Sequence, residues 1–240
     1  GSAGIADRAH EIAVDSNAVF KICSITKTFT AVLILQLMEE NKISLDATIG
    51  TYLKDYTGEA KNKATILHLL TYSSGIPDCE SYTGEDIYQR PISRDSFITA
   101  YCSGDLIPNP GTKFHYGNGE YVLLGKIIET VTGKSFEDNI RQRILEPLKM
   151  EHTGIFTAGK IVKGLVDAYL YNDSLKTFTT DAPYYIENYF SAGAMYSTVK
   201  DMLKFDQGIF TYRLLKKETV NRMVTPNPSL DNVGLGFWVA

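Results

Sequence analysis

Apolar residues are densest in one segment of this chain, residues 24–40. At the start of the segment they recur at helical spacing, at Ile25, Phe29, Val32 and Leu33. Residues 34–38 are then apolar at almost every position, so apolar side chains cover nearly all faces of the helix that this pattern predicts. We therefore expect this helix to be buried between layers of structure instead of lying on the surface.

Weaker periodic patterns predict further elements on either side of that helix. Helices are expected over residues 65–72, 94–102, 120–131, 136–144, 198–207 and 217–224. Strands are expected within residues 5–22 and at residues 234–239. Helices thus dominate the middle of the chain, and strands lie near its two ends. We expect a discontinuous α/β part that contains the sheet, residues 1–45 and 185–240, and a mostly helical part, residues 46–184.

The composition is that of a soluble globular protein. Of the 240 residues, 44% are hydrophobic and 22% are charged, and the formal net charge is −4. A net negative charge does not favour a groove for nucleic acid or binding to an anionic membrane surface. The longest apolar stretch, residues 31–38, is interrupted by Gln36 and is too short to span a bilayer. We therefore expect neither nucleic acid nor a membrane among the partners of this chain.

The cysteines and histidines give no sign of a metal or cofactor site. Cys23, Cys79 and Cys102 leave at least one thiol unpaired and form no Cys-x-x-Cys pair. The four histidines are scattered, without a His-x-x-x-His pair and without carboxylates at ligand spacing. We expect no metal and no cofactor, and these residues do not indicate a cellular compartment.

The predicted buried helix carries a serine and a lysine three residues apart, Ser24 and Lys27. Positions i and i+3 lie on one face of a helix, so the hydroxyl and the amine can meet. A serine hydroxyl becomes a good nucleophile when an adjacent base takes its proton, and a lysine can serve if burial lowers its pKa. The alternative is an N-capping serine followed by a solvated lysine. Cys23 is expected to pack into the core, because consecutive helical positions point about 100° apart.

A second motif, Tyr116-x-Asn118, lies on a predicted loop before the helix over residues 120–131. Such a loop can direct a phenol oxygen and an amide at the same site. An isolated Tyr-x-Asn is more simply explained as a turn with a tyrosine packed beneath it. Together with Ser24 and Lys27, however, it indicates one site with a nucleophile, two groups able to transfer protons, and an amide.

With both motifs the chain resembles the class C-like serine β-lactamase family. This family includes class C β-lactamases, low-molecular-weight penicillin-binding proteins, D-aminopeptidases and β-lactamase-like esterases. Ser24-x-x-Lys27 and Tyr116-x-Asn118 are similar to its first two motifs. Further family segments recur in the same order at residues 69–76, 125–133, 146–150, 152–154, 191–201 and 234–238. The similarity extends over almost the whole chain.

The resemblance implies an α+β fold of the β-lactamase/transpeptidase type, with an antiparallel sheet flanked by helices and a mostly helical domain. It implies that Ser24 is the nucleophile that becomes acylated, with its backbone N–H as one oxyanion donor. Lys27 and Tyr116 would share proton transfer, and the sequence does not decide which of them takes the serine proton. Asn118 would bind the amide carbonyl of the substrate and hold Lys27 in place.

The resemblance is incomplete near both ends of the chain. The family has a third motif, Lys-Thr-Gly or His-x-Gly, after the segment that corresponds to residues 234–238, and the sequence reaches Ala240 without it. The family also has a helix and strands before the segment that corresponds to residues 5–22. We therefore expect an incomplete sheet, with the remaining strands supplied by a partner chain or by a segment outside these residues. Weak catalysis is expected from these residues alone.

The activity that the resemblance implies is that of an exported serine hydrolase, in the periplasm, the cell envelope or the extracellular space. It would acylate Ser24 and hydrolyse the acyl-enzyme, with a β-lactam, a D-amino-acid peptide or a small ester as substrate. The alternative is a binding or sensor domain that takes up a penicillin or a cell-wall peptide without turnover. An α/β-hydrolase is not favoured, because the chain has no Gly-x-Ser-x-Gly motif.

Overall fold

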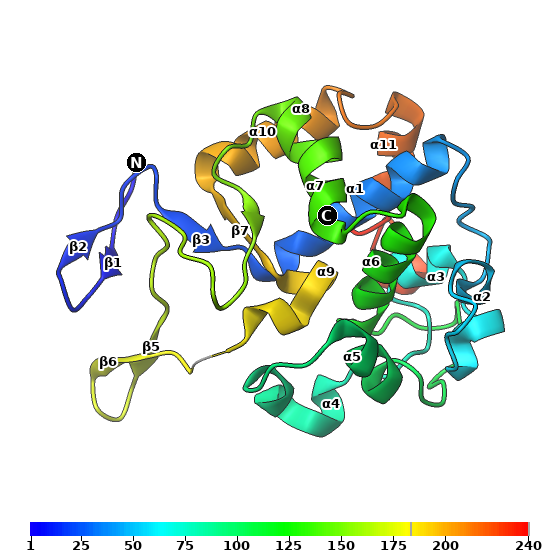
Figure 1. Ribbon diagram of the computed structural model, residues 1–240, viewed down its shortest axis with the longest axis horizontal. Coiled ribbons are helices and arrows are strands. Elements are labelled where there is room, and N and C mark those ends of the chain that lie inside the picture. The colour runs from blue at the N-terminus through cyan, green and yellow to red at the C-terminus, as the bar shows by residue number, and fades with distance from the viewer. Residues whose placement is uncertain (183, 240) are drawn as a thin grey trace.

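The computed structural model describes residues 1–182 and 184–239, without the side chains of Tyr82 and Glu85. Most helices pack around helix α1 (Thr26–Glu39), and two small hairpins project from one side of this body (Figure 1). The hairpins pair β1 (Ile5–Asp7) with β2 (Ile12–Ala13), and β5 (Tyr169–Asn172) with β6 (Thr177–Thr180).

Helix α1 is buried over most of its length, as its apolar pattern predicts. Its ten buried residues include every position from 29 to 35. Full burial of one aliphatic side chain contributes about 1.5–3 kcal/mol, so this helix is a main source of core stability. A 3-10 turn, η1 (Cys23–Ile25), precedes α1, and Ser24 therefore lies just before the helix instead of inside it.

A three-stranded antiparallel sheet leads into this turn. Its strands, in the order β3-β7-β4, are β3 (Val19–Lys21), β7 (Met195–Thr198) and β4 (Gly154–Ile155). Lys21 pairs with Tyr196, and the N–H of Ile22 then donates to the carbonyl oxygen of Met195 at 2.9 Å. The sheet thus fixes the backbone up to two residues before Ser24.

Two helices from distant parts of the chain pack on α1 near its beginning. They are α6 (Gly119–Thr132) and α9 (Phe190–Gly193). The carbonyl oxygen of Ser191 accepts a hydrogen bond from Thr30 Oγ1 (2.7 Å), and the Ser191 hydroxyl donates to Tyr121 O of α6 (2.7 Å). Gly125 allows α6 to approach α9, because a Cβ at that position would clash with Ser191. Buried hydrogen bonds therefore connect the three helices next to Lys27.

The remaining helices are short, apart from α10 (Val199–Phe210). They are α2 (Ile49–Tyr52), α3 (Ile66–Leu70), α4 (Glu80–Thr83), α5 (Arg94–Tyr101), α7 (Phe136–Ile140), α8 (Glu146–Leu148) and α11 (Lys217–Met223). Thr65 caps α3 by accepting a hydrogen bond from the N–H of His68. Helices α2 and α4 have no counterpart among the predicted elements, because four residues are too few to show a helical period.

The strand predicted for residues 234–239 is wrong. The N–H of Gly234 donates to the carbonyl oxygen of Phe237 at 2.7 Å, which closes a turn. Gly236 has a φ of +82°, a conformation that interrupts an extended strand. An isolated bridge joins Val233 to Trp238, and the described residues there form no longer ladder.

The observed elements match the predicted combination of an antiparallel sheet with many helices. One hydrophobic core includes residues from Ile22 to Leu235, so it extends through both of the predicted parts. The division into residues 1–45 with 185–240 and residues 46–184 stays a prediction.

Candidate active site

Ser24 is an exposed residue at which the two predicted proton-transfer groups meet. Lys27 Nζ lies 2.9 Å from Ser24 Oγ, and the Tyr116 hydroxyl donates a hydrogen bond of 2.7 Å to the same atom. The lysine follows the serine by three residues, as its spacing predicts, whereas the tyrosine comes from the loop before α6. A hydroxyl with a base and an acid at hydrogen-bond distance can be activated as a nucleophile.

Lys27 is buried, with 1% of its surface exposed, and three oxygen atoms surround its amine. Besides Ser24 Oγ, these are Asn118 Oδ1 at 2.7 Å and Ala192 O at 3.0 Å. Burial lowers the pKa of Lys27 to about 7, because water no longer solvates the ammonium. A neutral amine has two N–H donors and one lone pair. If the two carbonyl oxygens accept both donors, the lone pair of neutral Lys27 faces the Ser24 hydroxyl.

Tyr116 is the second group at the serine, and other aromatic rings pack against it. The ring centroids of Tyr72 and Trp238 lie 5.0 Å and 5.6 Å from that of Tyr116. Burial raises the pKa of Tyr116 above its ordinary value. At neutral pH the phenol therefore keeps its proton, while the amine of Lys27 is available to accept one.

Asn118 contacts Lys27 and is itself held by acidic residues. Its Oδ1 accepts from Lys27, and its Nδ2 donates to Glu80 Oε1 (2.8 Å) and to the Tyr88 hydroxyl (3.2 Å). Its backbone N–H donates to Asp78 Oδ1 at 3.2 Å. All four predicted site residues thus come together, and the side-chain N–H groups of Asn118 already have protein partners.

Three carboxylates beside these residues, Asp78, Glu80 and Glu120, have no counterpart among the predicted site residues. Glu120 is 1% exposed, and its Oε1 accepts a hydrogen bond from Ser74 Oγ at 3.0 Å. Burial raises the pKa of Glu120 to about 7. The negative charges of the three carboxylates oppose the loss of the Lys27 proton. In the sequence, only their positions close to segments that resemble the family could have indicated these carboxylates as site residues. That indication is weak, because acidic residues are common at protein surfaces.

Cys23 is an exposed residue and does not belong to the hydrophobic core, so the prediction that it packs into the core is wrong. Cys23 has a φ of +44° and lies in the 3-10 turn before α1. The angular separation of consecutive α-helical positions therefore does not apply to it.

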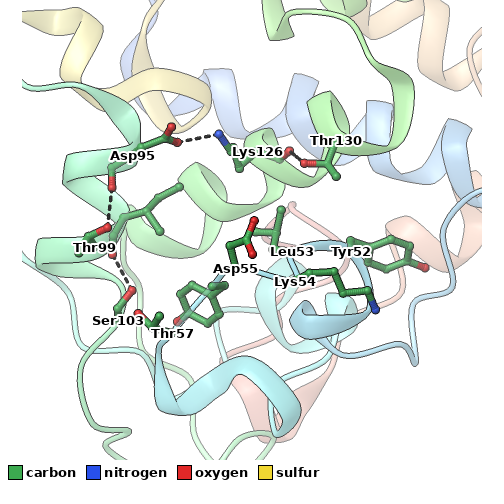
Figure 2. A pocket seen from close by; sticks show the side chains of 12 residues that line it. Tyr52, Leu53, Lys54, Asp55, Thr57, Asp95, Thr99, Ser103, Lys126 and Thr130 are labelled. Carbon is green, nitrogen blue, oxygen red and sulfur yellow. Dashed lines mark hydrogen bonds and ion pairs between the residues drawn. The ribbon is translucent and has the colours of Figure 1, made fainter.

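A cavity of about 480 Å³ contains none of these residues. Figure 2 shows its lining, which comes from α5, α6, residues 52–57 and Ser103. Asp95 and Lys126 form an ion pair of 2.6 Å there, and the hydroxyls of Thr99 and Thr130 donate to backbone carbonyl oxygens. Because these polar groups are already engaged with one another or with the backbone, the serine site is the better candidate for chemistry.

Within residues 1–182 and 184–239, no helix is both long enough and apolar enough to cross a membrane. The side chains described in these ranges include no group of three or more His, Cys, Asp or Glu that could hold a metal ion.

The chain is similar to known proteins over most or all of its length. A family model described as Beta-lactamase matches residues 1–240. A teichoic acid D-alanine hydrolase of Staphylococcus aureus is 30% identical over 208 residues, which are 87% of this chain and 50% of that protein. The chain thus spans about half the length of the curated relatives it matches.

Solved structures with the same fold include a penicillin-binding protein from Bacillus halodurans. It has a TM-score of 0.85 at 27% identity, and the match covers 99% of this chain and 74% of that one. A D-amino acid amidase from Ochrobactrum anthropi SV3, complexed with D-phenylalanine, has a TM-score of 0.85 at 25% identity. That match covers 98% of this chain and 70% of the amidase.

Proposed function

The chain belongs to the beta-lactamase family, and on this basis we propose that it is a serine hydrolase with Ser24 as its nucleophile. The family and the fold predicted from the sequence are confirmed by the match over residues 1–240 and by the structural neighbours. One observation carries the proposal of the nucleophile: Ser24 Oγ contacts two proton-transfer groups, Lys27 Nζ at 2.9 Å and the Tyr116 hydroxyl at 2.7 Å.

Acylation begins when Ser24 Oγ forms a bond to the carbonyl carbon of the substrate and its proton passes to Lys27 Nζ. The carbonyl π electrons move to the oxygen, whose negative charge the backbone N–H of Ser24 stabilises. The bond to the leaving alcohol or amine then breaks, and the leaving group takes the proton of Tyr116. The products of this step are an ester on Ser24, a Lys27 ammonium and a Tyr116 phenolate.

Deacylation restores the initial protonation states. Water gives one proton to the Tyr116 oxygen and forms a bond to the acyl carbon. When the bond from this carbon to Ser24 Oγ breaks, the serine takes the proton of Lys27 and the carboxylic acid leaves. Lys27 is the favoured acceptor of the serine proton, because burial lowers its pKa to about 7 and raises that of Tyr116.

The substrates that we favour are esters or amides of D-amino acids. Support comes from the teichoic acid D-alanine hydrolase at 30% identity and from the D-amino acid amidase at 25% identity. β-Lactams and N-acylated D-amino-acid peptides contain a carbonyl that the same chemistry can open and are the alternatives. On the same basis we place the whole protein at the cell envelope, outside the cytoplasm.

Hydrolysis of 4-nitrophenyl acetate by the wild type, Ser24→Ala and Ser16→Ala tests the proposal. Loss of the nucleophile is expected to lower kcat/KM by at least ~10³-fold. Ser16 is an exposed serine in the turn before β3, and its replacement is expected to leave the rate unchanged. Equal rates for wild type and Ser24→Ala would rule out Ser24. One equivalent of nitrophenol without turnover would indicate the binding or sensor domain instead.

A further inference from the structure

We propose that Trp238 binds an aromatic ring in the leaving group of the substrate and thereby selects among substrates of the serine site. The proposal rests on the serine hydrolase function, in which the leaving group takes the proton of Tyr116. It names the leaving groups that the site favours: alcohols and amines that carry an aromatic ring. The proposed preference for D-amino acids concerns the acyl group, so the two proposals describe opposite sides of the bond that breaks.

Trp238 packs on the residue that faces the leaving group. Its ring centroid lies 5.6 Å from that of Tyr116, with 40° between the ring planes. The hydroxyl of Tyr116 donates to Ser24 Oγ at 2.7 Å, and Lys27 Nζ lies 4.8 Å from the centre of the Tyr116 ring. One tyrosine side chain thus separates Trp238 from the nucleophile. A leaving group that takes the Tyr116 proton therefore lies beside the ring on which Trp238 packs.

The ring of Trp238 is accessible on one side and supported on the other. Trp238 is 52% exposed and Tyr116 is 36% exposed, so a ligand can reach both rings. Tyr72, which stacks on Trp238 with centroids 5.4 Å apart, is buried, and Phe114 contacts the tryptophan at 5.9 Å. Aromatic rings pack on one another at such distances, and the exposed part of Trp238 can accept one more ring in the same way.

The backbone that carries Trp238 is fixed against the helix that carries Lys27. A Cβ on Gly236 would lie 2.5 Å from Ala31 Cβ and 3.9 Å from the carbonyl oxygen of Lys27, so the turn before Trp238 lies directly on α1. An isolated antiparallel bridge pairs Trp238 itself with Val233. A ring that is already held in place loses little conformational freedom when a ligand packs on it, which favours binding.

Two pairs of esters test the proposal, and in each pair a saturated ring with the same number of carbon atoms replaces the aromatic ring. Benzyl acetate and cyclohexylmethyl acetate differ in the leaving group, whereas methyl phenylacetate and methyl cyclohexylacetate differ in the acyl group. Titration of the released acid at constant pH gives kcat/KM for each ester. Trp238→Leu is expected to lower the ratio of kcat/KM for benzyl acetate to that for cyclohexylmethyl acetate by about 3–10-fold and to leave the ratio of the acyl pair unchanged.

Two further variants separate contact with the ligand from a structural role of Trp238. Trp238→Phe keeps an aromatic face and is expected to retain most of the preference for benzyl acetate. Phe210→Leu removes a ring of similar exposure, 50%, from the end of α10 and is expected to leave both ratios unchanged. If Trp238 only stabilised the fold, its replacement would lower the rates of both acetates alike, and their ratio would stay the same.

Binding at Trp238 can also be measured without hydrolysis, because this residue is the one tryptophan among the 240 residues. The probes are N-benzylacetamide and N-(cyclohexylmethyl)acetamide, added to Ser24→Ala, which lacks the proposed nucleophile. We expect N-benzylacetamide to change the tryptophan emission until the site is saturated. Its Kd is expected to be about 3–10-fold lower than that of the cyclohexylmethyl compound.

An unchanged ratio for the two acetates in Trp238→Leu would overturn the proposal, and so would a change confined to the acyl pair. Tryptophan emission that does not respond to N-benzylacetamide would do the same. If the esters were still hydrolysed in a Ser24-dependent manner, the hydrolase function would stand without this aromatic site. Absence of Ser24-dependent hydrolysis of all four esters would overturn the hydrolase function and the leaving-group role together, even if N-benzylacetamide still bound at Trp238.

Discussion

Burial of Lys27, and not a neighbouring cation, lowers the pKa of its amine. Glu120, Glu80 and Asp78 act in the opposite direction, because a negative charge favours the ammonium. The resulting pKa of about 7 lets the lysine exchange a proton with Ser24 at neutral pH.

The rate of acylation is expected to depend on pH through this amine. Only neutral Lys27 can accept the serine proton, so kcat/KM for 4-nitrophenyl acetate is expected to rise through an apparent pKa of about 7 and to level off above it. Carboxylates and Tyr116 face the same amine, so the apparent pKa belongs to the whole group of residues. A rate that is constant between about pH 5.5 and 8.5 would contradict this role.

Glu120→Gln is expected to move that pH dependence to lower pH. The negative charge of Glu120 raises the pKa of Lys27, so a neutral glutamine lets the lysine lose its proton more easily. The glutamine retains an oxygen that can accept the hydrogen bond of Ser74. Glu137→Gln, which changes an exposed carboxylate on α7, serves as the control and is expected to leave the profile in place. A move to higher pH in Glu120→Gln would be inconsistent with this charge effect.

The placement of the site residues could be predicted because their order and spacing are specific. Ser24 and Lys27 are one helical turn apart, and the Tyr116-x-Asn118 motif identified the distant partner. The carboxylates could not be predicted, because their importance depends on burial and on which atoms of Asn118 they contact. This burial and these contacts form only when segments that are distant in the sequence pack together.

At the scale of elements, long apolar patterns were the reliable signal. Helices α1 and α6 have enough apolar positions to show both their period and their burial. The strand prediction for residues 234–239 failed because their apolar side chains favour a strand, whereas the backbone at Gly234 and Gly236 closes a turn. Four-residue helices such as α2 escape prediction, since tertiary packing and not an apolar period stabilises them.

Residues 191–201, one of the segments that resemble the family, have a structural role at the beginning of α10. Asp201 is buried and accepts hydrogen bonds from the N–H of His152 (2.8 Å) and from Thr153 Oγ1 (3.0 Å). Thr198 caps the helix by accepting from the N–H of Asp201 at 3.2 Å. These contacts connect β7, α10 and the segment before β4, so this motif stabilises the sheet that leads to Ser24.

Phe205→Ala tests the packing of α10 on α1. The ring of Phe205 stacks on Phe29 with centroids 3.7 Å apart, and Phe205 is 3% exposed. The substitution is expected to lower the free energy of unfolding by about 3–5 kcal/mol, because it leaves a cavity in the core. Leu203→Ala on the same helix, where the side chain is 56% exposed, is expected to cost less than about 0.5 kcal/mol. Urea denaturation measures both changes, and equal losses would contradict the observed packing.

At the scale of the whole molecule, one core joins the two predicted parts. We therefore expect a single cooperative unfolding transition. The 15 tyrosines report tertiary packing in near-ultraviolet circular dichroism, and the far-ultraviolet signal reports the helices. The two midpoints are expected to coincide. Two separate transitions would mean that the parts fold independently and that the common core contributes little to stability.

The acylation of Ser24 is tested most directly by mass spectrometry of the protein and its peptides after acid quenching at intervals following addition of 4-nitrophenyl acetate. We predict an acetyl adduct on the peptide that contains Ser24, which forms and then decays in the wild type and is absent from Ser24→Ala. The same adduct in folded Ser24→Ala, or a folded wild type that is acylated only elsewhere, would contradict the assignment of Ser24 as the nucleophile.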